Sequence, residues 1–115
     1  LLHFKLLLYY HYTALNQLPK VKLNYQYDYT TDNEFGNVKL VVRNPSESIA
    51  FFNFMDVVDP KSGNPILPVY WTDNYVTLLP GEERTYEAKF FLSDFKSEKP
   101  ALQIRGWNVD KTTIN

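Results

Sequence analysis

Hydrophobic and polar side chains alternate without interruption between Val21 and Tyr29. The odd-numbered positions carry Val, Leu or Tyr, and the even-numbered positions carry Lys, Asn, Gln or Asp. Successive side chains of a β-strand point to opposite faces of the sheet, so this period of two predicts a strand with one buried and one solvated face. The Thr-Asp-Asn-Glu-Phe-Gly stretch at 31–36 then predicts a turn, because its residues bend the chain or tolerate positive φ.

The same period recurs downstream and predicts further strands at 38–43, 85–92 and 102–109, with one or two more between Tyr70 and Leu79. Within the last of these, Gly106 is expected to be a β-bulge or a point of close backbone approach. The polar stretch 93–99 is expected to form one helical turn.

The most apolar run is 49–58, and it has no clean polar face. We expect it to be a strand covered on both faces, since such strands show continuous rather than alternating hydrophobicity. The following Asp59–Asn64 stretch predicts a hairpin loop, with Gly63 supplying the left-handed position. Pro65 and Pro68 bracket a piece expected to be an edge strand or a crossing, because proline cannot donate to a β-ladder.

These elements amount to about seven strands, with turn signals every 8 to 12 residues. We therefore predict an all-β fold, an immunoglobulin-like β-sandwich of about seven antiparallel strands. A chain of 115 residues has room for one such domain, which we place at 20–115.

Residues 1–19 are interpreted as a leader or linker. The first residue is Leu rather than Met, which indicates a processed chain or a fragment. The apolar stretch that opens the chain spans only a dozen residues, whereas a membrane-spanning helix needs about 20. We therefore expect no membrane partner, and an amphipathic membrane contact is the weaker alternative.

Composition narrows the function further. The 12 basic and 13 acidic residues give a net charge of −1, which argues against a nucleic-acid surface. The absence of cysteine excludes disulfides and thiolate metal sites. The two histidines, His3 and His11, both lie in the leader without nearby carboxylates, so we predict no metal and no cofactor.

Catalysis by this chain is not expected. Asp56, Asp59 and Asp73 could approach one another across a hairpin, but Asp59 is already explained by its turn. An acidic turn at 32–34 is similarly expected to be a turn rather than a calcium site. We predict no catalytic residue.

Aromatic residues make a better candidate surface, since the chain has nine Tyr, eight Phe and two Trp. One candidate set, a site of domain contact or glycan contact, is Tyr70, Trp71, Asp73, Asn74 and Tyr75. A second is the stripe of Tyr25, Tyr27 and Tyr29. Exposed rings in either set could stack on sugar rings or dock a neighbouring domain; the competing interpretation, favoured for the tyrosine stripe, is that the rings roof the core.

Four stretches of the sequence together suggest a family: TALNQLPKVKL, NPSESIAFF, LPVYWTDNYVTLLPGEERTY and RGWNV. The chain from Thr13 to Val109 resembles the C-terminal immunoglobulin-like domain of glycoside hydrolase family 2 enzymes. The likeness is greatest to exo-β-D-glucosaminidases and to mannosylglycoprotein endo-β-mannosidases. In such enzymes the catalytic glutamates belong to an upstream (β/α)8 barrel, so the resemblance transfers no catalytic residue to this chain.

The resemblance implies a non-catalytic accessory module that packs against other domains of a parent glycosidase, in a secreted or periplasmic protein. The alternative is a stand-alone carbohydrate-binding module that holds glycan with its exposed aromatics.

Overall fold

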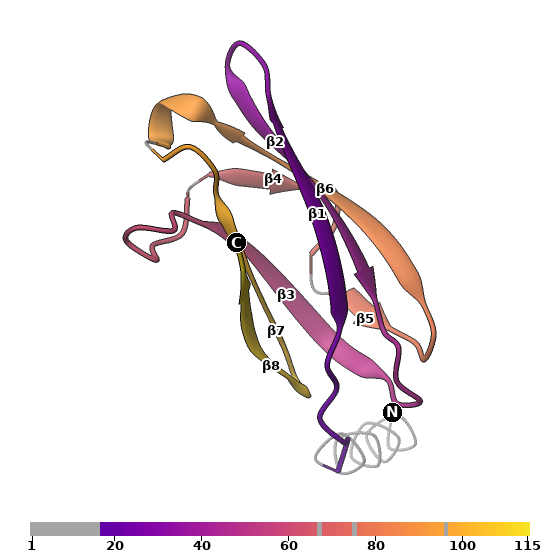
Figure 1. The fold of residues 1–115 in the computed structure, drawn as a ribbon. Helices are drawn as coiled ribbons and strands as arrows, with labels where there is room; N and C mark the ends of the chain where they lie inside the picture. Colours follow the sequence, from indigo (N-terminus) through magenta and orange to yellow (C-terminus); the bar gives the residue numbers. More distant parts are fainter. Residues whose placement is uncertain (1–16, 67, 75, 96) are drawn as a thin grey trace, which may run out of the picture.

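The chain folds as two antiparallel β-sheets packed face to face (Figure 1). The computed structural model describes residues 17–115 except 67, 75 and 96. The first sheet has the strand order β1-β2-β6-β4 and the second β5-β3-β7-β8. The strands are β1 (Asn24–Thr31), β2 (Phe35–Arg43), β3 (Ala50–Val58), β4 (Val69–Trp71), β5 (Val76–Leu78), β6 (Glu83–Phe91), β7 (Ala101–Gly106) and β8 (Val109–Ile114). The predicted all-β, immunoglobulin-like sandwich is confirmed, with eight described strands rather than about seven.

The alternating pattern places one face of each strand in the core. Leu40 of β2 pairs with Tyr27 of β1 on one side and with Tyr86 of β6 on the other. Leu40 and Phe90 of the first sheet and Leu102 of the second are fully buried. Full burial of such a side chain contributes roughly 1.5–3 kcal/mol, so the contact between the two inner faces is the main source of stability.

The mixed pattern of 49–58 has a different cause from the one expected. Ala50 faces the core, but so do Asn53, Met55 and Val57, which have the opposite parity. The change of parity comes from a β-bulge between Ala50 and Asn53, where Phe52 has a φ of 49°. An extra residue in one strand reverses which side chains point inward. The outer face of β3 is half-buried or exposed as far as Asp56, with Val58 buried at its end, so the expectation of a strand covered along both faces was wrong.

The predicted strand at 102–109 is in fact two strands. β7 ends at Gly106, the chain reverses at Trp107 and Asn108, and β8 returns antiparallel. The pairing shifts register at Gly106, and a Cβ there would collide with the Asn53 side chain. Gly106 is therefore both the bulge and the close-approach point that the sequence predicted. The reversal was missed because Trp-Asn is not a recognised hairpin dipeptide.

The connections elsewhere follow their turn residues. Asp59–Asn64 forms a closed loop, with the amide of Gly63 donating to the Asp59 carbonyl at 2.7 Å and a φ of 74° at Gly63. Pro65 makes a single bridge to Val58, after which the chain crosses to β4 in the other sheet. A short 3-10 turn, η1 (Leu92–Asp94), follows β6 near the predicted helical turn. Within the described residues, no helix is long and apolar enough to span a membrane.

A buried side-chain amide in the turn between β7 and β8 closes one end of the sandwich; this turn lies at the lower end of the two strands in Figure 1. Asn108 is 2% exposed, and its Nδ2 donates to the carbonyls of Pro19 at 2.9 Å and Ile49 at 2.7 Å. Its Oδ1 accepts the amide of Phe51 at 2.9 Å, and its own carbonyl accepts the amide of Val21 at 2.8 Å. One residue thus ties the start of the described chain and the start of β3 to the β7–β8 turn.

Asn44 has a similar role between β2, β3 and β5. Its Nδ2 donates to the carbonyls of Ser48 at 2.7 Å and Leu78 at 3.2 Å. Its backbone exchanges hydrogen bonds with the corner that follows β5, accepting the amide of Gly81 at 2.8 Å and donating to the carbonyl of Glu82 at 2.9 Å. The corner residues that stood out in the sequence are therefore held by a buried asparagine.

Replacing Asn108 by Ala should lower the free energy of unfolding by about 3 kcal/mol, since an unsatisfied buried backbone group costs about 1–3 kcal/mol and several would be left. Urea denaturation followed by tryptophan fluorescence measures this change. Asn33→Ala, in an exposed turn, is the matched control and should change the free energy by less than about 0.5 kcal/mol. Equal effects of the two substitutions would contradict the account.

A second prediction concerns Glu82, whose carboxylate accepts the amide of Leu79 at 3.0 Å and Nε of Arg84 at 2.9 Å. The Leu79 amide and then Arg84 hold the pKa of Glu82 below its ordinary value of 4.5. Because the folded pKa is lowered, this stabilisation is fully present above the ordinary pKa and is lost as the pH falls through the folded value.

Thermal unfolding of the native chain and Glu82→Gln should therefore show a gap in midpoint temperature at about pH 6 that closes as the pH falls towards about 2. A gap that stays constant over this range would show that the carboxylate's charge has no part in holding the corner.

Candidate interaction surfaces

Each carboxylate that could have formed a catalytic site has its own local environment. Asp59 accepts the amide of Lys61 at 2.9 Å and the hydroxyl of Ser97 at 3.0 Å, and the first of these contacts does most to lower its pKa. Asp73 accepts the amide of the next residue. Asp56 lies half-buried on the outer face of β3, where burial raises its pKa and Arg105 opposes that rise. Each acid is accounted for by its own turn or strand.

Among the described residues, no three His, Asp or Glu side chains gather closely enough to hold a metal ion. At the acidic turn, Asp32 accepts the amides of Glu34 and Phe35 at 3.2 and 3.0 Å, which is the geometry of an Asx turn. His3 and His11 lie outside the described residues.

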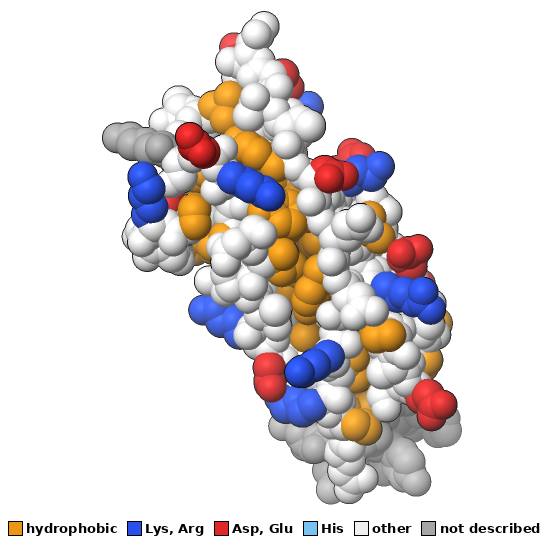
Figure 2. Space-filling view, viewed as in Figure 1, with side chains coloured by type: hydrophobic (Ala, Val, Ile, Leu, Met, Phe, Trp, Pro, Cys, Tyr) orange, Lys and Arg blue, Asp and Glu red, His pale blue; other side chains and the backbone are white. Residues whose placement is uncertain are grey.

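The tyrosine stripe packs along the edge of the core. Tyr25, Tyr27 and Tyr29 are half-buried against it, on the side of β1 that faces the other sheet. Tyr29 stacks on Phe90 with ring centroids 6.0 Å apart, and the Tyr27 hydroxyl donates to the Pro100 carbonyl at 3.0 Å. Figure 2 shows hydrophobic side chains as a band along the length of the molecule in this view. The inner faces of these three rings thus pack on the core, and the outer edges of the rings are accessible to a partner.

The stripe also carries a cation. Nζ of Lys99 lies 4.7 Å from the centroid of the Tyr27 ring, a cation–π distance. At one end of the stripe, burial raises the pKa of the Tyr25 hydroxyl, and Thr112 of β8 partly offsets the rise. These contacts join β1 to the second sheet across the open side of the sandwich.

The structure divides the other predicted set, that of Tyr70, Trp71, Asp73, Asn74 and Tyr75. Tyr70 on β4 points outward and is 57% exposed, whereas Trp71 is half-buried against the core. Asn74 replaces a strand partner for β3: its Oδ1 accepts the Met55 amide at 2.9 Å and its Nδ2 donates to the Met55 carbonyl at 3.2 Å. Asp73 is exposed, and Tyr75 lies outside the described residues. Within the described part of this set, Tyr70 is the aromatic ring that faces solvent.

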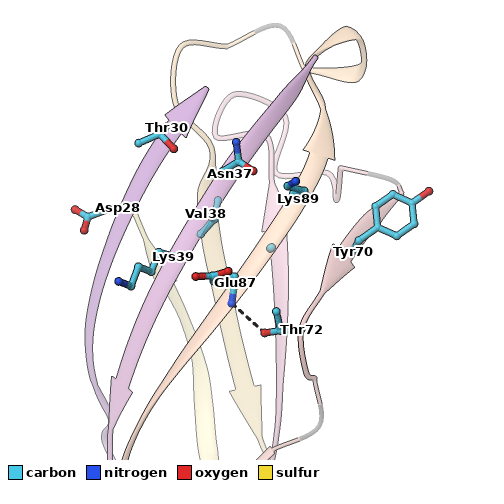
Figure 3. Close-up of a pocket in the computed structure, with 10 residues that line it drawn as sticks. Asp28, Thr30, Asn37, Val38, Lys39, Tyr70, Thr72, Glu87 and Lys89 are labelled. Atoms are coloured by element: carbon cyan, nitrogen blue, oxygen red, sulfur yellow. Dashed lines mark hydrogen bonds between the residues drawn. The ribbon is translucent and has the colours of Figure 1, made fainter. Parts of the chain in front are cut away.

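Tyr70 borders a groove on the outer face of the β1-β2-β6-β4 sheet (Figure 3). The groove has a volume of about 560 Å³. Its charged and polar lining comes from neighbouring positions on all four strands, and includes Asp28, Asn37, Lys39, Tyr70, Glu87 and Lys89. Tyr70 could be singled out from the sequence, but the other lining residues could not, because the register between strands decides which of them lie close together.

A third surface lies at the end of the sandwich that Asn108 closes. We call Phe51, Phe52 and Trp107 the aromatic end. The Phe51 and Phe52 rings have centroids 4.5 Å apart, and the Trp107 amide donates to the Phe51 carbonyl at 2.9 Å. Phe52 is 55% exposed and Trp107 44% exposed. The sequence did not reveal this cluster, because the bulge that turns Phe52 outward has no local sequence signal.

The chain is similar to proteins of a known family. The family model described as the exo-β-D-glucosaminidase Ig-fold domain matches residues 3–109. The chain belongs to this family. The match begins at residue 3, inside the segment that sequence analysis treated as a leader.

Relatives of this glucosaminidase Ig-fold domain are parts of much larger proteins. The chain is 46% identical over 65 residues to an exo-β-D-glucosaminidase of Amycolatopsis orientalis and 37% identical over 65 residues to one of Streptomyces avermitilis. Each match covers 56% of this chain but only 6% and 7% of the relative. The crystal structure of the A. orientalis exo-chitosanase CsxA superposes with a TM-score of 0.81 and 34% identity, over 87% of this chain and 12% of that chain.

The chain therefore corresponds to a small accessory domain of such enzymes, and the predicted resemblance is confirmed. The chain spans only a small part of the proteins that it matches, so its own surfaces, rather than the activity of those proteins, indicate its role.

The strain at the aromatic end can be measured. A residue other than Gly with left-handed φ costs about 1–2 kcal/mol, so at position 52 Phe52→Gly should be more stable than Phe52→Ala by about 1 kcal/mol. This reverses the usual order in strands, where Ala exceeds Gly by roughly 0.5–1 kcal/mol. The same pair of substitutions at Phe54 is the matched control and should follow the usual order. Urea denaturation compares the four variants, and an Ala variant more stable than Gly at position 52 would contradict the strained conformation.

Proposed function

We propose that this domain serves a multidomain glycoside hydrolase of the exo-β-D-glucosaminidase type, and that it packs against a neighbouring domain of that enzyme through its aromatic end. The observation that carries the proposal is the outward display of Phe52 and Trp107. Large exposed aromatics cost free energy in an isolated domain, and aromatic residues are enriched at the centres of protein interfaces.

The backbone at Phe52 supports the same conclusion. Its positive φ is unfavourable for a bulky residue, and such strain persists where the surrounding structure enforces it and is concentrated at functional sites. Here the Phe52 amide donates to the Thr77 hydroxyl at 3.2 Å, and the neighbouring Phe51 amide is held by Asn108. A strained backbone thus fixes the position of the exposed Phe52 ring at a cost in stability, as expected if this ring fits a partner.

The position of the N-terminal connection favours a neighbour on the same polypeptide. Asn108, next to Trp107, holds the carbonyl of Pro19 and the amide of Val21. The first described residues of the chain therefore lie beside the aromatic end. A domain attached there would have a high effective concentration at this surface without any further contact.

Glycan contact through exposed aromatics is the second candidate function. Tyr70 favours it, since this ring is exposed and borders a groove. The tyrosine stripe supports it less well, because its rings already pack on the core.

The test of docking compares the domain within the full-length enzyme and alone. In the full enzyme, Trp107→Ala should lower the midpoint of this domain's unfolding by several degrees more than in the isolated chain, since losing an interface hot spot costs about 2 kcal/mol. Tyr70→Ala, which removes an exposed ring at another place, should lower both midpoints by the same small amount. If Trp107→Ala has the same effect in both settings, the aromatic end does not dock.

A further inference from the structure

The floor of the groove consists of two rows that cross the strands. In one row, Lys39 of β2 lies opposite Asp28 of β1 and opposite Glu87 of β6. In the other row, Asn37 lies opposite Lys89, which lies opposite Tyr70 at the sheet edge. Four strands about 4.8 Å apart make a floor about 14 Å wide, with the two rows about 6.6 Å apart. Figure 3 shows these side chains spread over the outer face, with Tyr70 at one border.

The floor carries two acidic and two basic side chains, so its net charge is zero. Asp28 and Glu87 carry negative charge, and Lys39 and Lys89 carry positive charge. Within the described part of the chain, none of the four is in an ion pair; the ion pairs found there are Lys20–Asp110 and Arg84–Glu82. The groove therefore offers both donors and acceptors but no net charge.

Tyr70 supplies a fixed aromatic border. Its ring packs edge-on against Phe91, with centroids 6.4 Å apart and an interplanar angle of 82°. Beside it, Nζ of Lys89 lies 5.2 Å from the Phe35 ring centroid, which directs this cation along the sheet. The Thr72 hydroxyl accepts the amide of Glu87 at 3.1 Å, so β4 is also held to β6 by a side chain. Tyr70 is thus exposed but oriented.

We propose that this groove binds an oligosaccharide, with one pyranose ring against Tyr70 and sugar hydroxyls hydrogen-bonded to Glu87, Asp28 and Lys39. A hydroxyl both donates and accepts, so a sugar matches a floor of alternating acids and lysines. A phosphorylated ligand would be repelled by the carboxylates of Asp28 and Glu87. A purely apolar ligand would remove the four charged side chains from water without giving them partners, which costs free energy. The volume lies within the usual range for small-ligand sites, about 300–1,000 Å³. The choice of a sugar rests on the proposed function in a glycoside hydrolase.

Titration of the ¹⁵N-labelled chain with the tetramer of N-acetylglucosamine and with the tetramer of glucosamine tests the proposal. The neutral tetramer should bind with a Kd in the millimolar range and shift the amides of Asn37, Glu87 and Lys89. The cationic tetramer should bind no more tightly, because a groove without net charge gives its ammonium groups no net attraction. Tyr70→Ala and Glu87→Gln should each weaken binding at least fivefold, whereas Tyr70→Phe should keep it within twofold.

Leu79→Ala is the matched control, since Leu79 is 56% exposed but lies outside the groove, and it should leave the Kd unchanged. No shifts at about 10 mM ligand, shifts confined to other surfaces, or a Kd unaffected by Tyr70→Ala would each overturn the proposal. Binding of the cationic tetramer alone, abolished by salt, would replace hydroxyl recognition by charge attraction and would also overturn it. Because the titration uses the isolated chain, its failure would leave the docking result in the full enzyme untouched.

Discussion

The amide of Asn108 is the interaction on which the arrangement of this domain depends. It joins Pro19 to Ile49 and Phe51 at the start of β3, two segments that are far apart in the sequence. Backbone groups at these places have no ladder partner, because β3 is bulged and β7 has just ended. A buried polar group without a partner is costly, so the side-chain amide permits an irregular but closed end to the sandwich.

The irregular end has a functional consequence. A regular β3 would turn its aromatic residues alternately in and out, whereas the bulge sets Phe51 and Phe52 side by side. The buried Asn53 lies beneath them, donating to the carbonyls of Ala50 at 3.0 Å and Val76 at 2.9 Å. The domain thus has a strained, well-supported aromatic surface at one end and a charge-balanced groove on a sheet face. We propose that the first of these surfaces docks a neighbouring domain and that the second holds an oligosaccharide.

Sequence patterns predicted the regular parts of this structure well, since each depends on neighbours in sequence. The alternation at 21–29 gave β1, although the strand begins at Asn24 because Val21 is engaged by Asn108. The bulge at Phe52 and the reversal at Trp107 are joined by hydrogen bonds from Phe51 to Asn108 and from Trp107 to Phe51, which link segments far apart in the sequence, so no local pattern marks them. Likewise, the groove arises from register across four strands, and only Tyr70 could be singled out beforehand.

Hydrogen exchange of individual amides in the isolated chain tests the central claim most directly. The amides of Phe51 and Val21 both donate to Asn108, so they should exchange only on global unfolding, with protection within about 1 kcal/mol of the unfolding free energy. The exposed amide of Lys61, bonded within its own turn, should exchange much faster. If Phe51 and Val21 exchange as fast as Lys61, this end of the sandwich opens on its own, and Asn108 does not hold it.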